Sequence, residues 1–369
     1  MSTSTAPKRA PYKPDDVDRE LLNVLQAGIA LVRDPYREVG ERIGMGEDEV
    51  LHRLARLKDA GIIRQLSAIF DTRALGYTST LVAARYPTER LFDAAALIGG
   101  HPGVSHNYRR THDFNLWFTL AVAPDTQIGL ERTLDLLADA TDAESMRMLP
   151  TLELYKINVQ LDMTGKTAGD EKDAQPTPPP KRGDGVLPTD DDKWAIRILQ
   201  RDLPVESLPF DRWAAEADTT ADELLARAGT FRERAYMRRF AAVLNHRRAG
   251  FGGNGMAVWK VPEERLSSVG PQMAAFRAVS HCYRRPTYSD WPYNLFAMVH
   301  QRSREACEEA IAALAEETGI TDPNDRHVLY STYEFKKIRL EYFTDEYARW
   351  ERLALAGEEL PRWTRPGSE

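Results

Sequence analysis

The sequence contains little cysteine, no long apolar run and no excess of positive charge. Two cysteines, Cys282 and Cys307, occur among 369 residues, which excludes a disulfide framework and a zinc site built from paired Cys-x-x-Cys motifs. No stretch approaches the roughly 18 apolar residues of a membrane span, and residues 1–10 lack the apolar core of a signal peptide. The formal net charge of -7 argues against a protein that coats nucleic acid. We therefore expect a cytoplasmic protein without a membrane segment.

A proline-rich segment divides the chain. Residues 164–189 are rich in proline, glycine and charge and contain few large apolar side chains, which is typical of a linker. The rest of the chain has the composition of an ordinary globular protein, with 42% hydrophobic and 28% charged residues. The sequence therefore predicts folded domains on both sides of this linker.

The two sides of the linker repeat one another. GIIRQLSAIFDTRALGY at residues 61–77 aligns with AYMRRFAAVLNHRRAGF at residues 235–251. SHNYRR at residues 105–110 aligns with SHCYRR at residues 280–285, with five of six residues identical. TLELYK at residues 151–156 aligns with TYEFKK at residues 332–337. This self-similarity indicates an internal duplication.

Hydrophobic periodicity predicts the same elements in each half. The spacing of apolar residues indicates three helices, at residues 15–27, 35–43 and from 47 to the glycine at 61, with a glycine-containing turn that is typical of a helix-turn-helix. Strand and helix patterns follow in the order of a ferredoxin-like βαββαβ domain. Its strands are expected at residues 65–71, 80–84, 104–109, 116–122 and 149–158, and its helices at 90–98 and 126–138.

The predicted fold class is therefore α+β, with each half a winged helix-turn-helix followed by a ferredoxin-like domain. The predicted domains are a helix-turn-helix at 15–63, a ferredoxin-like domain at 64–163, the linker at 164–189, a second helix-turn-helix at 190–237, a second ferredoxin-like domain at 238–345 and a C-terminal tail at 346–369.

Histidine, tyrosine and arginine recur together on one predicted strand of each half. Because side chains alternate along a strand, His106, Tyr108 and Arg110 share one face, as do His281, Tyr283 and Arg285 in the repeat. Guanidinium groups bind carboxylates, aromatic rings pack on flat ligands, and histidine moves protons or ligates iron. This combination suits a large, planar ligand that carries carboxylates.

The two halves resemble a known regulator architecture but lack its DNA-binding charge. A winged helix with a βαββαβ domain resembles the leucine-responsive regulators. The N-terminal end of a recognition helix must approach phosphates and bases, and here it reads Glu47, Asp48, Glu49, while residues 218–223 of the second half are also acidic. We therefore expect no binding to DNA.

The paired strand motifs resemble those of siroheme decarboxylases, which are relatives of these regulators. The segments are SHNYRRTHDFNLWFT at 105–119 and SHCYRRPTYSDWPYNLFAMVH at 280–300. The family pairs two kinds of subunit, one with an NLWF-like segment and one with a WPYNLF…H segment. The first half of this chain is similar to the former kind and the second half to the latter. The resemblance implies removal of the two acetate carboxylates of siroheme, on the route to d1-type haem or ordinary haem. It implies no cofactor beyond the substrate's iron, and a homodimer of fused chains; it leaves open whether further decarboxylase subunits are required.

The resemblance also implies roles for the clustered residues. The candidate proton donors are His106, His112, His281 and His300. The candidate substrate-binding residues are Tyr108, Arg109, Arg110, Trp117, Lys156, Tyr283, Arg284, Arg285, Trp291, Asn294 and Lys337. His106 or His281 is the candidate axial ligand to the siroheme iron, and no metal site of the protein's own is expected.

Several alternatives stay open at the level of sequence. Each histidine and arginine could serve a structural role, and the tryptophans could be core residues. A transcriptional regulator or a haem-binding carrier would share the architecture. The second half has about four extra residues between Arg285 and Asn294, so the two sites need not be equivalent, and the sequence does not decide which half is active.

Overall fold

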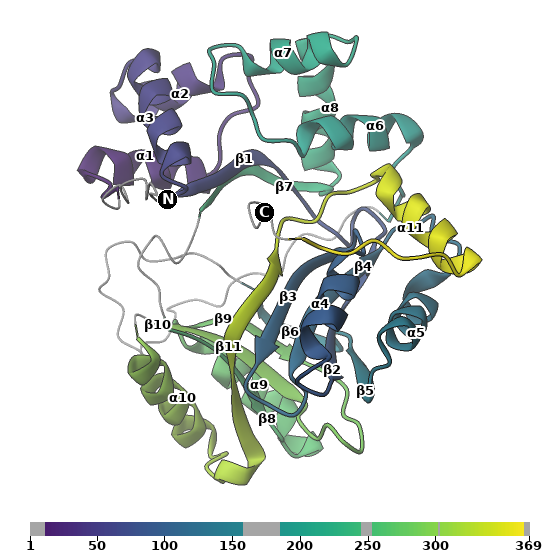
Figure 1. Cartoon of the computed structure of the whole chain (residues 1–369). Helices are drawn as coiled ribbons and strands as arrows, with labels where there is room; N and C mark the ends of the chain where they lie inside the picture. The colour runs from purple at the N-terminus through teal and green to yellow at the C-terminus, as the bar shows by residue number, and fades with distance from the viewer. Residues whose placement is uncertain (1–11, 158–184, 245–252, 302, 365–369) are drawn as a thin grey trace, which may run out of the picture. The chain divides into compact units, whose positions relative to one another are not determined.

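The computed structural model describes residues 12–157, 185–244, 253–301 and 303–364, which form two compact units. Of the described residues, the first unit contains 12–71 and 194–244, and the second contains 72–157, 185–193, 253–301 and 303–364. Each unit therefore takes one segment from each half of the duplicated sequence, as the colours of Figure 1 show. Most of the predicted linker, residues 164–184, lies outside the described residues.

The first unit holds both helix-turn-helix segments. The first half supplies α1 (Asp16–Ala27), α2 (Pro35–Ile43), α3 (Glu47–Asp59) and β1 (Ile63–Phe70), and the second half supplies α6 (Asp190–Leu199, from Trp194 onward), α7 (Pro209–Glu216), α8 (Ala221–Glu233) and β7 (Met237–Leu244). A capping box between Asp15 and Asp18 begins α1, and Gly44, with φ of 68°, ends α2 in the left-handed conformation that glycine tolerates best. The three predicted helices of the first half are confirmed.

Strand β1 does not belong to the ferredoxin-like domain in which the sequence placed it. It pairs antiparallel with β7 in a two-stranded sheet, with Ile63 opposite Leu244 and Phe70 opposite Met237. The first unit extends to Asp71 and so includes this strand. The strand was assigned to the wrong domain because an apolar strand pattern does not specify its partner strand.

The second unit combines two ferredoxin-like domains into one sheet. The first domain contains β2 (Thr78–Arg85), α4 (Leu91–Gly99), β3 (Val104–Arg110), β4 (Leu116–Val122), α5 (Gly129–Thr141) and β5 (Ser145–Leu149), followed by β6 (Glu153–Ile157). The second contains β8 (Gly253–Trp259), α9 (Leu266–Ala275), β9 (Val279–Arg284), β10 (Leu295–Gln301), α10 (Arg304–Thr318) and β11 (Arg326–Lys337), with short 3-10 turns at Glu263–Arg265 and Pro323–Asp325. The nine strands follow the order β5-β2-β4-β3-β11-β8-β10-β9-β6.

The domains exchange their last strands. β6 leaves the first domain and pairs with β9, while the C-terminal part of β11 leaves the second domain and pairs with β3. The single strand predicted at residues 149–158 is therefore two strands, β5 and β6, which are separated by Pro150 and lie at opposite ends of the strand order. Residues 150–152 connect β5 directly to β6, so the two edges of the sheet lie close together and the sheet is curled.

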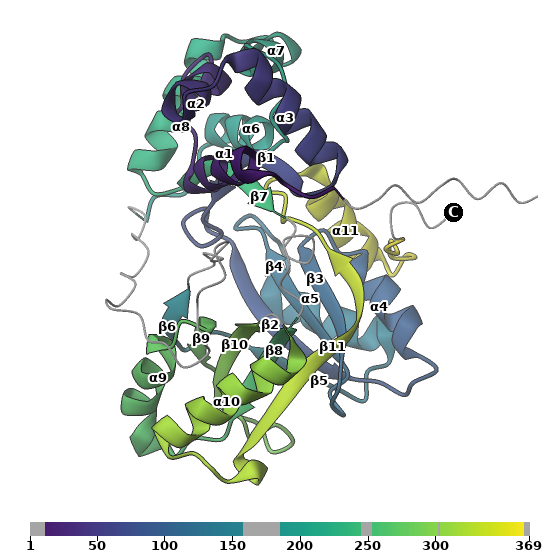
Figure 2. The same cartoon turned by 90° about the vertical axis from the view of Figure 1, so that its left-hand side faces the viewer.

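Helices cover the outer face of the curled sheet, and an apolar cluster fills its inner face. α4 and α5 pack on the first domain and α9 and α10 on the second (Figures 1 and 2). The inner cluster draws side chains from both domains, and we call it the central cluster. Its buried members are Ala83, Phe114, Trp117, Leu149, Met256, Val258, Trp291, Phe296 and Leu329. The α+β class and the duplicated architecture are confirmed.

The predicted C-terminal tail is largely a helix. α11 (Asp345–Ala356) places Trp350, which is 1% exposed, in the core of the first ferredoxin-like domain. Trp363, farther on, donates a backbone hydrogen bond to the carbonyl of Ala96 at 2.7 Å. Across the described residues, no helix combines the length and apolar character that crossing a membrane requires.

Candidate functional site

The inner face of β3 carries the predicted histidine, tyrosine and arginine. The ring centroids of His106 and Tyr108 lie 6.1 Å apart, and the Arg110 guanidinium lies 5.5 Å from the centre of the Tyr108 ring. Asn107 points to the outer face, where its amide donates to the carbonyl of Ala95 in α4. The predicted alternation along this strand is confirmed.

Strand β9 repeats this arrangement. The rings of His281 and Tyr283 lie 6.0 Å apart, and the Arg285 guanidinium lies 4.8 Å from the centre of the Tyr283 ring. Cys282 faces the outer core, and burial raises the pKa of its thiol to about 12. A thiol held in that protonated form is a poor nucleophile, so Cys282 acts as a small core residue.

Two buried guanidinium groups lie beside the central cluster. Nη1 of Arg110 donates to the carbonyl of Leu329 at 2.8 Å, and Nη1 of Arg285 donates to the carbonyl of Leu149. Burial lowers the pKa of each guanidinium to about 10. The two carbonyls come from equivalent strands of the two domains, so the duplication is preserved in this detail.

The central cluster separates the two sets. Three strands lie between β3 and β9 in the strand order. Trp117 and Trp291 are almost fully buried, with ring centroids 5.1 Å apart, and the indole of Trp117 donates to the carbonyl of Phe114. Both tryptophans therefore serve as core, while the Tyr108 and Tyr283 rings lie beside the histidines of β3 and β9.

Each strand histidine has a serine neighbour. The hydroxyl of Ser105 lies 2.9 Å from Nδ1 of His106, and the hydroxyl of Ser280 lies 2.7 Å from Nδ1 of His281. Burial, followed by the charge of Arg285, lowers the pKa of His281 to about 4. His281 is therefore neutral in the free protein at neutral pH.

The other two candidate proton donors differ in their surroundings. His300 lies on β10 with its Nδ1 2.6 Å from the side-chain oxygen of Asn254. His112 lies in the turn after β3, where Nδ1 accepts from the backbone of Phe114 and the ring packs 5.2 Å from that of Trp291. Burial, with a contribution from nearby His327, lowers the pKa of His112 to about 4. The sequence interpretation did not assign a role to His327, which is distant in sequence from His112.

Three predicted ligand-binding residues are engaged elsewhere. The Lys156 ammonium is buried and donates to the carbonyl of Phe276 at 2.8 Å, beyond the last residue of α9. The Asn294 side chain accepts from the backbone of Val261 and donates to its carbonyl. Arg284 forms an ion pair with Glu263. Lys156 and Asn294 are thus structural residues, because both use their polar groups to fix the backbone.

The sequence alignment of the last strands was shifted by one residue. In the strand register, Lys156 lies opposite Cys282 of β9. Asn107 of β3 is the counterpart of Cys282 in the other half, and the residue opposite Asn107 is Lys336. Lys336 donates to the carbonyl of Gly99 at the end of α4, as Lys156 does at α9. Lys337 lies instead opposite His106. An irregularity in each strand pair, between Glu334 and Lys336 and between Leu154 and Lys156, shifts the register, so sequence alignment alone does not give it.

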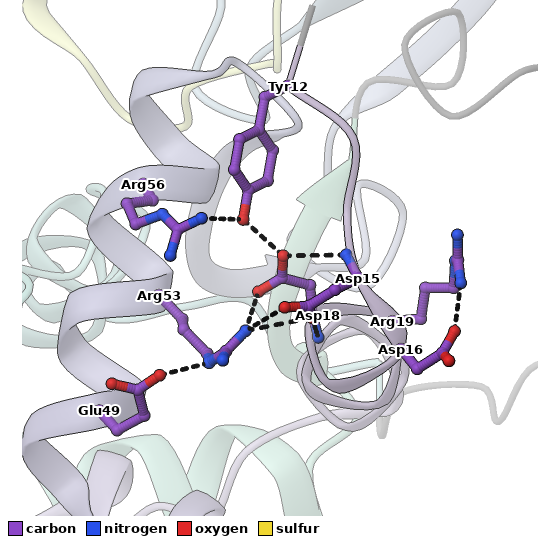
Figure 3. A network of polar contacts seen from close by, with 8 residues as sticks. All are labelled: Tyr12, Asp15, Asp16, Asp18, Arg19, Glu49, Arg53 and Arg56. Carbon is purple, nitrogen blue, oxygen red and sulfur yellow. Dashed lines mark hydrogen bonds and ion pairs between the residues drawn. The ribbon is translucent and has the colours of Figure 1, made fainter.

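Two basic residues of the recognition-helix equivalent α3, Arg53 and Arg56, make polar contacts within the first unit. Arg53 donates to Asp15, Asp18 and Glu49, and Arg56 donates to the hydroxyl of Tyr12 at 2.9 Å (Figure 3). Glu47, Asp48 and Glu49 occupy the first turn of α3. The first turn of α3 is therefore acidic, and Arg53 on the same helix is engaged by carboxylates.

Comparison with known proteins defines the class. An AsnC-like ligand binding domain model matches residues 74–156 and 248–336, and a model described as siroheme decarboxylase NirDL-like HTH domain matches residues 18–64 and 192–238. The chain is thus a fusion of two homologous halves, each a helix-turn-helix joined to an AsnC-like domain.

The relatives identify the family. A protein from Hydrogenobacter thermophilus named siroheme decarboxylase is 37% identical over 334 residues, which cover 90% of this chain and 96% of that protein. The crystal structure of the siroheme decarboxylase NirDL matches with a TM-score of 0.71 at 32% identity, covering 93% of this chain and 99% of that one, and another structure of NirDL is a complex with an iron-uroporphyrin III analogue. A siroheme decarboxylase beta subunit from Methanosarcina barkeri is 41% identical over 142 residues, covering 38% of this chain and 91% of that protein. The chain belongs to the siroheme decarboxylase family.

Proposed function

We propose that the chain decarboxylates siroheme, removing carbon dioxide from two of its acetate side chains to give didecarboxysiroheme. The observation that carries this proposal is the pair of inner-facing His-Tyr-Arg sets on β3 and β9 in a chain of this family. This activity makes the protein a carboxy-lyase.

The reaction needs an acid and a bound substrate. In each step the bond between the side-chain carbon and its carboxylate breaks, and carbon dioxide leaves. The electron pair stays on that carbon, delocalised into the conjugated ring, until a proton from the acid completes a methyl group. Atoms and electrons balance without an oxidant, so we expect no cofactor beyond the iron that the substrate carries.

We assign the role of proton donor first to His281. Its imidazole is neutral in the free protein because burial and Arg285 lower its pKa to about 4. A substrate carboxylate beside Arg285 offsets that positive charge and raises the pKa of His281 toward its ordinary value. Substrate binding would thereby help to protonate the acid.

Three further histidines and three other residues keep the roles that the resemblance implies. His106, His112 and His300 are the alternative proton donors, and His106 or His281 is the proposed axial ligand. Lys337, opposite His106 on the neighbouring strand, is a further candidate for a carboxylate contact. Tyr108 and Tyr283 are proposed to pack against the macrocycle.

The test is an anaerobic incubation of the purified chain with siroheme, followed by mass spectrometry of the pigment. We expect two successive losses of carbon dioxide from the wild-type reaction. His281→Ala should slow turnover by roughly 100-fold or more if His281 supplies the proton, and His106→Ala tests the other half. His52→Ala, at an exposed position of α3, is the matched control and should retain full activity. Tight binding with no change of mass would contradict the proposal and favour a carrier.

The cellular context follows from the same proposal. We propose a cytoplasmic enzyme whose product feeds d1-type haem or ordinary haem, that binds no DNA and whose chains form a homodimer. Sedimentation of the purified chain tests the homodimer, and sedimentation with candidate decarboxylase subunits tests whether further subunits bind.

A further inference from the structure

Two adjacent arginines occur on the equivalent strand of each half, and they point in opposite directions. Arg110 and Arg285 lie on the inner side with Tyr108 and Tyr283. Their neighbours Arg109 and Arg284 are partly exposed, and Arg284 is already paired with Glu263. Arg109 and Arg284 can therefore serve as controls for Arg110 and Arg285.

Among the described residues, the inner guanidinium groups are buried without a counter-charge. Arg110 is 9% exposed and Arg285 is 8% exposed. Each donates one hydrogen bond to a strand carbonyl, and Nε of each has no hydrogen-bond partner. Within the part of the chain that the structure describes, neither forms an ion pair with a carboxylate. A buried cation without an anion costs folding free energy, so its retention calls for a compensating role.

The buried lysines show what a structural cation looks like in this fold. The ammonium groups of Lys156 and Lys336 donate to the carbonyls of Phe276 and Gly99, at the C-terminal ends of α9 and α4. The partial negative charge of a helix C-terminus stabilises a cation there. The inner arginines have no such helix end, because their carbonyl partners belong to strands.

The surroundings of Arg285 also favour an anion beside its guanidinium group. Arg73 lies close enough for its positive charge to contribute to lowering the pKa of Arg285, after the larger effect of burial. Two rings flank the Arg285 guanidinium, Tyr283 at 4.8 Å and Phe296 at 5.4 Å. The side chain is therefore held in position before any ligand arrives, which reduces the entropy lost on binding.

We propose that Arg110 and Arg285, and not Arg109 and Arg284, bind carboxylate groups of the tetrapyrrole, with one such arginine in each half of the chain. This assignment rests on the proposed function, because siroheme supplies the carboxylates. A carboxylate provides the charge and the lone pairs that the buried guanidinium lacks, in the bidentate geometry that arginine favours.

The experiment compares Arg110→Met and Arg285→Met with Arg109→Met and Arg284→Met in the full chain. Siroheme is titrated anaerobically into each protein, and binding is followed by the absorbance of the pigment. Loss of a charged hydrogen-bonding partner should weaken binding by roughly 10- to 100-fold in each inner variant, while the outer variants should stay within about twofold of wild type. The inner variants should unfold at the same temperature as wild type or higher, since methionine removes an uncompensated buried charge.

Two results would overturn the assignment. One is wild-type affinity for siroheme in either inner variant. The other is a fall in unfolding temperature that accompanies the loss of binding, which a purely structural arginine would produce. Wild-type protein that binds siroheme without releasing carbon dioxide would contradict the proposed function but leave the comparison of affinities valid, so the two failures are distinguishable.

Discussion

At the scale of single residues, burial decides the charge of His101. Its side chain is 2% exposed, Nδ1 accepts a hydrogen bond from the backbone of Gly103 at 2.9 Å, and the ring lies 4.4 Å from that of Trp350. Burial, with the nearby charge of Lys336, lowers the pKa of His101 to about 3. His101 is therefore a neutral structural residue that helps to hold α11 against the first ferredoxin-like domain.

This depressed pKa predicts an acid-sensitive contribution to stability. The folded state favours neutral His101, so its contribution is complete above the ordinary pKa of about 6.5 and is lost as the pH falls from there toward 3. Between pH 6.5 and 5, wild type should lose about 2 kcal/mol of unfolding free energy more than His101→Asn, which keeps a hydrogen-bond acceptor but does not titrate. Urea unfolding at the two pH values measures the difference.

The matched control is His52→Asn at an exposed position of α3. This variant should keep the pH dependence of wild type. Parallel pH dependences for wild type and His101→Asn would show that burial does not suppress the protonation of His101.

The residue-level predictions succeeded where strand alternation decides the outcome. His106, Tyr108 and Arg110 share a face because successive side chains on a strand point in opposite directions. Lys156 and Asn294 were assigned to the ligand because their types suit it, yet each satisfies a backbone group that only tertiary contact brings near. Residue type alone does not distinguish these two uses.

At the scale of elements, Arg53 joins α3 to the start of α1. Its Nη1 lies 3.0 Å from Asp15 and 2.9 Å from Asp18, and its Nε lies 2.7 Å from Glu49 (Figure 3). The Asp18 side chain is fully buried, so Arg53 compensates a carboxylate that water cannot reach. These contacts raise the pKa of Arg53 above its ordinary value, chiefly through Asp15 and Asp18.

Replacing Arg53 should therefore destabilise the first unit. Arg53→Met leaves the buried Asp18 carboxylate without its cation, and we expect a loss of about 3 kcal/mol of unfolding free energy. Arg19→Met removes the exposed pair with Asp16, also drawn in Figure 3, and should leave stability within experimental scatter. Equal unfolding midpoints for the two variants in urea would contradict this role of Arg53.

Helices were predicted more accurately than strand pairings. The bounds of α1, α2 and α3 follow from local signals, namely apolar spacing, caps and Gly44. The separation of β5 from β6 and the docking of α11 depend on partners that are far away in the sequence. Local patterns therefore left one strand too long and interpreted a helix as a tail.

At the scale of the whole molecule, neither half is complete without the other. The first half supplies β6 to the sheet of the second domain, and the second half supplies part of β11 to the sheet of the first. Both halves also contribute to the β1–β7 sheet of the first unit. The duplicated chain thus contains within itself the pairing of unlike subunits that the family resemblance implied.

A break between the halves should therefore leave a functional protein. Residues 1–163 and 185–369, produced together as two chains, should copurify and retain siroheme decarboxylation within about tenfold of the intact chain, because their association becomes concentration-dependent. Each piece alone should lack activity and unfold less cooperatively. Full activity in either piece alone would contradict a shared sheet, and so would failure of the two folded pieces to associate.

The sequence by itself determined the duplication, the fold class, the helices and the alternating His-Tyr-Arg strands, because these depend on local periodicity and on comparison of the chain with itself. The tertiary structure decided which strands pair and that Lys336 is the counterpart of Lys156. It also decided that Arg110 and Arg285 are buried without a counter-charge from the residues that the structure describes. Register, burial and electrostatic compensation arise from contacts between residues distant in the chain. They become visible only once the two halves are brought together in one sheet.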